Sequence, residues 1–128
     1  MRIKAQHRDG FTEHLLKWTL ETDVDSEVAH VSSRWFAPNG NGTAEFNIPF
    51  DGSILRTNIA AMDALQESYS LPMTDCGMLI LEIERDGKVR TWDFYGCEGL
   101  LEDHPELEPF FEFWRPLSNA IESKLALR

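Results

Sequence analysis

The residues of this chain that could do chemistry are two cysteines, four histidines and many carboxylates. The cysteines flank the clearest hairpin of the sequence, in which Asp86-Gly87 forms a two-residue turn between the strand-like runs 77–85 and 88–96. This turn places Cys76 opposite Cys97, at a non-hydrogen-bonded pair with Cα atoms about 4.5 Å apart. A disulfide is sterically possible there, but two reduced thiols are favoured in a cytoplasm.

Other chemical motifs are incomplete. The histidines are isolated in the sequence, at His7, His14, His30 and His104. Their spacing fits no familiar zinc site. The acidic run 23–27 resembles the start of a calcium loop, but Val28 occupies the position that requires glycine. No serine lies in a G-x-S-x-G setting, and no glycine-rich phosphate loop is present. We therefore expect no metal, no cofactor and no enzymatic activity.

The densest group of carboxylates lies between residues 96 and 112, a segment without lysine or arginine. These carboxylates are Glu98, Glu102, Asp103, Glu106, Glu108 and Glu112. Part of this acidity is typical of a helix start at residues 103–106, where acids offset the helix dipole. The rest suits a surface that binds a basic protein. We predict that the six carboxylates and Phe113 form a partner-binding surface.

The same region begins a C-terminal helix with one apolar stripe. The stripe consists of Leu107, Phe110, Phe111, Trp114, Leu117, Ile121 and Leu125. Phe113 lies off this stripe beside Glu112, so we expect its ring to be exposed. Pro116 lacks a backbone donor and should kink or split the helix near Arg115.

The first half of the chain predicts antiparallel strands, because apolar residues alternate with polar ones. Asp9-Gly10 indicates a two-residue turn after the first strand. Leu16, Trp18 and Leu20 then alternate as in a strand, although a helix over residues 11–20 is an alternative.

A second turn lies within residues 39–42, between strands around Trp35 and Phe46. A turn at Asn41-Gly42 would pair Trp35 with Ile48, and a turn at Asn39-Gly40 would pair it with Ala44. Both registers bury the same residues.

An amphipathic helix is predicted over residues 54–69, with Asp51-Gly52-Ser53 as its cap and Pro72 beyond its end. The sequence as a whole predicts an α+β fold in one domain spanning residues 1–128. We expect an antiparallel meander of about four strands, a helix, a β-hairpin and a C-terminal helix kinked near Pro116.

The net charge of the chain limits which classes of molecule could be its partner. The chain has a net charge of −10, and residues 65–128 contribute more of it than residues 1–64. Such a surface repels phosphate backbones and anionic lipids, so neither nucleic acid nor membrane binding is expected. A basic protein partner is favoured, with solubility as the alternative reason for the charge. The sequence contains no apolar run typical of a signal peptide or membrane span, and we expect a cytoplasmic location.

These features resemble those of bacterial toxin-immunity proteins, the cognate inhibitors of polymorphic or contact-dependent toxins. The shared features are acid clusters at 21–27 and 98–112, neighbouring aromatic residues, and no catalytic motif. The resemblance implies an inhibitor that blocks a toxin active site, with many such toxins being nucleases with basic clefts. Acidic export chaperones, inhibitors of bacterial defence encoded by phage, and a small enzyme are the alternatives. The oligomeric state stays open.

Overall fold

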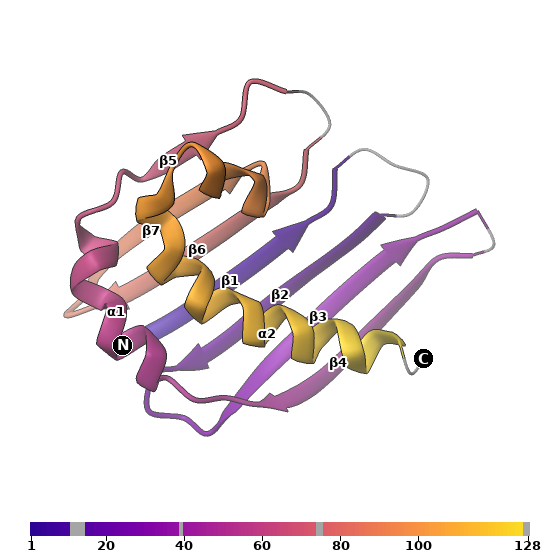
Figure 1. Ribbon diagram of the computed structural model, residues 1–128. Coiled ribbons are helices and arrows are strands. Elements are labelled where there is room, and N and C mark those ends of the chain that lie inside the picture. The colour runs from indigo at the N-terminus through magenta and orange to yellow at the C-terminus, as the bar shows by residue number, and fades with distance from the viewer. Residues whose placement is uncertain (11–14, 39, 74–75, 127–128) are drawn as a thin grey trace.

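The computed structural model describes residues 1–10, 15–38, 40–73 and 76–126. In this described part, the chain has a mixed α+β fold in which one sheet of seven strands is covered on one face by helices (Figure 1). The strands are β1 (Arg2–Arg8), β2 (Leu15–Asp23), β3 (Val28–Phe36), β4 (Gly42–Pro49), β5 (Ser68–Ser70), β6 (Met78–Arg85) and β7 (Lys88–Tyr95). Their order across the sheet is β4-β3-β2-β1-β6-β7-β5, and only the β5–β7 pair is parallel among these described strands.

The strand prediction for residues 15–20 is confirmed, because β2 begins at Leu15. The prediction of a two-residue turn at Asp9-Gly10 is wrong. Asp9 instead continues the pairing of the two strands: its N–H donates to the carbonyl of Leu16 at 3.0 Å, and its side chain accepts from the N–H of Leu16 at 2.9 Å. The connection is therefore longer than two residues, and residues 11–14, including His14, lie outside the described residues.

The β3–β4 register differs from both predicted registers, because Trp35 pairs with Gly42 and Ser33 pairs with Ala44. The turn lies earlier than predicted: the N–H of Gly40 donates to the carbonyl of Ala37 at 3.0 Å. Pro38, which follows Ala37, suits the second position of such a turn. The shift from either predicted register is an even number of residues, so the predicted inner face is still the buried one.

The first helix, α1 (Ser53–Asp63), is shorter than predicted. The helix starts at the predicted cap, residues 51–53. Gly52 is the N-cap, and the side chain of Asp51 accepts a hydrogen bond from the N–H of Ser53 at 2.9 Å. Tyr69 does not belong to the helix but to β5, which pairs with β7. The spacing of Tyr69 from Leu65 continues the apolar stripe and therefore predicts a helical position. In the structure Tyr69 lies on a strand, and its side chain is buried.

The β6–β7 hairpin has the predicted register, with Leu81 opposite Trp92 and Leu79 opposite Phe94. Asp86 and Gly87 form the turn with φ of 52° and 75°, as a type I′ turn requires. At the other end the strands end at Met78 and Tyr95, although the N–H of Gly96 still donates to the carbonyl of Gly77 at 2.9 Å. Gly96 then turns the chain with φ of 116°. Cys76 and Cys97, both within the described residues, are not joined by a disulfide.

The C-terminal region begins with two short 3-10 helices, η1 (Cys97–Glu102) and η2 (Pro105–Leu107), followed by α2 (Glu108–Ala126). The helix start predicted at residues 103–106 would make Asp103 the N-cap residue, which is wrong: His104 is the N-cap of η2 and provides no side-chain hydrogen bond. Helix α2 runs through Pro116 without a split. A bend at Pro116, as distinct from a split, stays a prediction.

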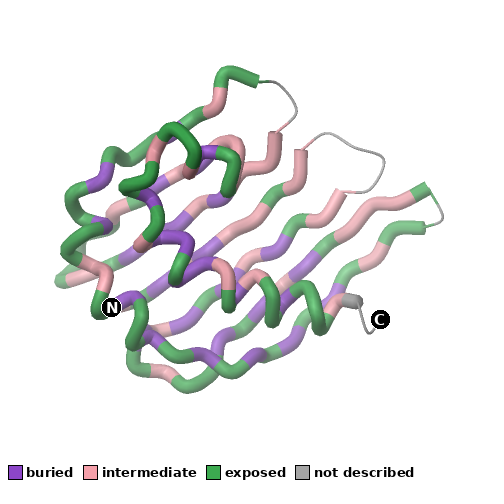
Figure 2. Tube along the Cα trace, viewed as in Figure 1, coloured by how far each residue is buried: buried purple, intermediate pink, exposed green. Residues whose placement is uncertain are grey.

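The core lies between the sheet and the helical layer (Figure 2). The predicted core positions Phe110, Phe111 and Trp114 are confirmed as buried. The expectation for Phe113 is wrong: this residue is 3% exposed. Helix α2 packs against α1 as well as the sheet, so its buried face is wider than a single stripe and includes the flank of Phe113.

The opposite face of the sheet has no helix over it in the described part of the chain (Figure 1). The side chains on this open face are mostly polar or charged, as alternation along the strands requires. None of the described helices has both the length and the apolar character needed to cross a bilayer.

Candidate functional site

The predicted acidic site lies on the chain that leads from β7 into α2. Its six carboxylate residues are all exposed: Glu98, Glu102, Asp103, Glu106, Glu108 and Glu112. Four of the apolar residues between them point inward and are fully buried, namely Leu100, Leu107, Phe110 and Phe111. We call residues 98–112 the acidic segment. Its carboxylates stand on a backbone that buried side chains fix in place.

One cation organises part of the acidic segment. The guanidinium of Arg115 donates to Glu108 at 2.7 Å and to Glu98 at 3.0 Å. These hydrogen bonds hold the pKa of the Glu108 carboxyl below its ordinary value. Arg115 thereby fixes the geometry of two carboxylates that are far apart in sequence and reduces the net charge that they present.

The other carboxylates of the acidic segment differ in whether they form hydrogen bonds or ion pairs within the chain. Glu112 accepts from the amide of Asn58 at 3.1 Å, which links the acidic segment to α1. Glu106 lies 3.2 Å from the ring of His104. Among the described residues, Glu102 and Asp103 have no side-chain hydrogen bond or ion pair, so their charge is the most available to a partner.

The predicted aromatic member of the site does not join it. Phe113 faces a groove between α1 and α2, lined also by Phe50, Ile54 and Pro116. A buried ring offers no area to a partner, so the acidic segment presents carboxylates without the aromatic anchor that we expected.

Cys97 lies next to the acidic segment, in a small hollow that Glu98 and Arg115 also line. Burial, with the negative charge of Asp9 as the second cause, raises the pKa of the Cys97 thiol to about 11. A nucleophilic cysteine requires thiolate near neutral pH. The hollow also contains His7, whose ring nitrogen lies 2.6 Å from Asp9. This arrangement suits a structural thiol better than a catalytic one.

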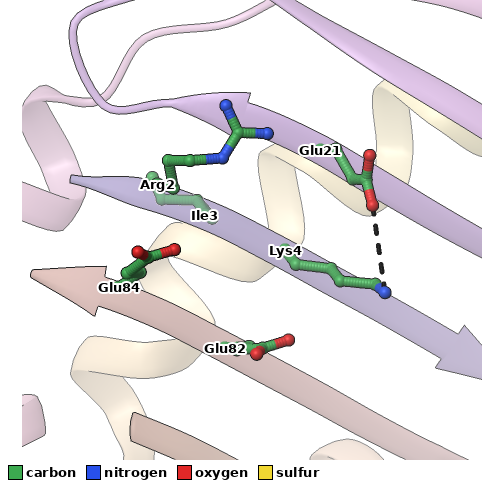
Figure 3. Close-up of a pocket in the computed structure, with 6 residues that line it drawn as sticks. All are labelled: Arg2, Ile3, Lys4, Glu21, Glu82 and Glu84. Carbon is green, nitrogen blue, oxygen red and sulfur yellow. Dashed lines mark ion pairs between the residues drawn. The ribbon is translucent and has the colours of Figure 1, made fainter. Parts of the chain in front are cut away.

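Within residues 1–10, 15–38, 40–73 and 76–126, no group of three or more histidine, cysteine, aspartate or glutamate side chains is arranged to hold a metal ion. The charged groups on the open face of the sheet are arranged instead in rows across the strands. At one end, Lys4 lies between Glu21 and Glu82 in the register, and its ammonium is 3.8 Å from Glu21. Figure 3 shows these side chains on the face turned away from the helix, with Arg2 and Glu84 beside them.

At the other end of the same face the charges do not alternate. Arg8 pairs with Lys17, and Lys17 pairs with Arg34, so three cations lie side by side on three neighbouring strands. We call Arg8, Lys17 and Arg34 the basic row. No pattern in the sequence indicates this row, because the three residues are far apart in the chain and only the strand register brings them together.

A comparison with models of protein families finds none that matches this chain, and a comparison with curated proteins finds no significant match.

Proposed function

We propose that this chain is an acidic protein-binding inhibitor, an immunity protein that neutralises a cognate bacterial toxin in the cytoplasm by covering its active site. The observation that carries the proposal is the arrangement of the acidic segment: six exposed carboxylates alternate with fully buried apolar side chains. The charge is therefore presented on an ordered backbone rather than on a flexible tail.

An ordered surface matters because association costs conformational entropy when loops and side chains become fixed. Leu100, Leu107 and Phe110 anchor the acidic segment in the core, so little ordering remains when a partner binds. Negative charge on such a surface accelerates the encounter with a basic cleft and favours basic partners over acidic ones. A nuclease toxin, whose cleft attracts phosphates, is the partner that this charge fits best.

The test uses co-expression with the adjacent reading frame. The proposal expects that this frame encodes a toxic protein, that the present chain restores growth, and that the two purify as a 1:1 complex. A harmless neighbour that forms no complex would contradict the proposal. A dimer that binds only an unfolded segment of its neighbour would favour an export chaperone instead.

Charge-reversal variants locate the interface. The variant E102K/D103K changes two exposed carboxylates whose side chains form no hydrogen bond or ion pair within the described residues. We expect association with the toxin to slow at least tenfold and to depend less on salt.

The matched control is E84K/E122K, which makes the same change in net charge at exposed positions outside both acid clusters. This control should associate nearly as fast as the unchanged protein. Equal slowing in both variants would show that total charge, rather than the acidic segment, governs binding.

A further inference from the structure

The basic row is unusual for the chain that contains it. Arg8, Lys17 and Arg34 are all exposed, and each lies directly opposite the next in the β-ladder. Like charges directly opposite each other on one face destabilise a sheet. Within the described residues, none of the recorded ion pairs joins these three side chains to a carboxylate. Among the described residues, the row therefore has a like-charge repulsion that no ion pair offsets.

The other end of the same face shows the arrangement that favours stability. There Arg2 has Asp23 on one side and Glu84 on the other, and Lys4 is flanked by glutamates in the same way. The same strand, β1, thus has cations flanked by carboxylates at one end and, at the other, a cation opposite another cation. This contrast indicates that the basic row is kept for a role other than folding.

The surroundings of the row suit a ligand that is only partly charged. A hollow of about 370 Å³ is lined by the three cations together with polar side chains that include Gln6, Thr19 and Ser32. Apolar side chains lie next to the row on the same face. Leu15 lies opposite Phe36, and Met78 lies opposite Arg8 on the neighbouring strand. All three apolar residues are half-buried.

We propose that the basic row binds an acidic segment of a protein partner, independently of the acidic segment of this chain. Neighbouring strands are about 4.8 Å apart, so three cations span about 10 Å. An extended peptide places alternate side chains about 6.8 Å apart on one side. Two acids separated by one residue would therefore each lie between two neighbouring cations of the row.

The same face argues against a nucleic acid as the occupant. Acids lie farther along the same face: Glu21 and Glu82 are at its other end, and Asp93 is on β7. A strand with a phosphate on every nucleotide would meet them where it extends beyond the row. A peptide can place its acids over the basic row and apolar side chains over Leu15 and Phe36.

The experiment measures the fluorescence anisotropy of a labelled (Glu-Ser)₅ peptide with the full chain at low salt. We expect saturable binding that weakens as salt is added. In the variant R8Q/K17Q/R34Q the affinity should fall at least tenfold. In the control R56Q/K88Q/K124Q, which also removes three exposed positive charges but from other surfaces, it should change less than twofold.

Three results would overturn the proposal: no binding by the unchanged protein, equal loss in both triple variants, or stronger binding of an oligothymidylate of the same charge. The melting temperature provides a further readout, because a row that is kept for binding should not stabilise the fold. R8Q/K17Q/R34Q should melt at the same temperature as the unchanged protein or higher. A lower melting temperature would assign the row a structural role and would contradict the proposal. The single variant K17Q repeats the measurements of peptide affinity and melting temperature with only one charge removed.

Discussion

Arg90, on β7, donates a hydrogen bond of 2.7 Å from its guanidinium to the backbone carbonyl of Asp63, the last residue of α1. A second guanidinium nitrogen donates to the carbonyl of Leu65 at 2.8 Å. The same group lies 4.6 Å from the centroid of the Trp92 ring. The end of a helix leaves carbonyls without intrahelical partners, so a side chain of the sheet helps to define where α1 stops.

Replacing Arg90 with lysine should lower the free energy of unfolding by about 1–2 kcal/mol, because one ammonium cannot reproduce the planar fork that reaches two carbonyls. Urea denaturation followed by circular dichroism measures the change. K88Q, at an exposed position on the same strand, is the control and should change stability by less than about 0.5 kcal/mol. If R90K is as stable as the unchanged protein, the guanidinium does not secure the end of α1.

Trp114 is 3% exposed, and its ring centroid lies 5.2 Å from that of Trp18. Trp114→Ala should reduce the free energy of unfolding by about 3–5 kcal/mol, because it leaves a cavity between α2 and the sheet. Trp114→Phe keeps an aromatic contact and should lose less. Chemical denaturation of both variants gives the comparison, and a loss below about 1 kcal/mol for the alanine variant would contradict the packing described.

The thiol of Cys97 should react slowly. Burial raises its pKa from 9.0 to about 11, so the thiolate fraction at pH 8 falls about a hundredfold below that of an unshifted thiol. The variant C76S isolates Cys97, and its alkylation by iodoacetamide in the folded state should be correspondingly slow. Addition of urea should restore a rate close to that of a small thiol. A fast reaction in the folded state would show that Cys97 is accessible and ionised.

The ion pair between Arg115 and Glu108 should appear in the titration of the carboxyl. Hydrogen bonding to the guanidinium holds the folded-state pKa of Glu108 below its ordinary value of 4.5, so this pair stabilises the fold above that value. Its contribution is lost as the pH falls through the lowered pKa. Carbon-detected NMR should find the Glu108 pKa below 4.5 in the unchanged protein and higher in R115Q. An identical pKa in both proteins would exclude the guanidinium as the cause.

Local patterns predicted those elements in which sequence neighbours decide the structure. The Asp86-Gly87 turn fixed its own register because a two-residue turn allows one pairing. Alternation correctly identified the buried positions of the first four strands, even though the β3–β4 register was wrong, because an even shift leaves each side chain on the same face. The exposure of the six carboxylates of the candidate site also agrees with their type and pattern.

The failures arose where a distant segment outweighed the local pattern. Tyr69 fits a helical stripe, yet pairing with β7 placed it in a strand. Phe113 lies off the stripe of α2, yet the contact with α1 buried it. Both outcomes depend on the neighbouring segment in the fold, and the periodicity of a single segment carries no information about that neighbour.

The α+β composition, the alternating core positions and the excess of acid follow from residue type and local spacing, and could therefore be predicted from the amino-acid sequence. The tertiary structure decided that both helices cover one face of the sheet and that Phe113 is buried. It also decided that Arg8, Lys17 and Arg34 lie side by side. The physical reason is that a sheet joins residues through the hydrogen-bond register of separate strands, so the surfaces it creates combine residues that are far apart in the chain.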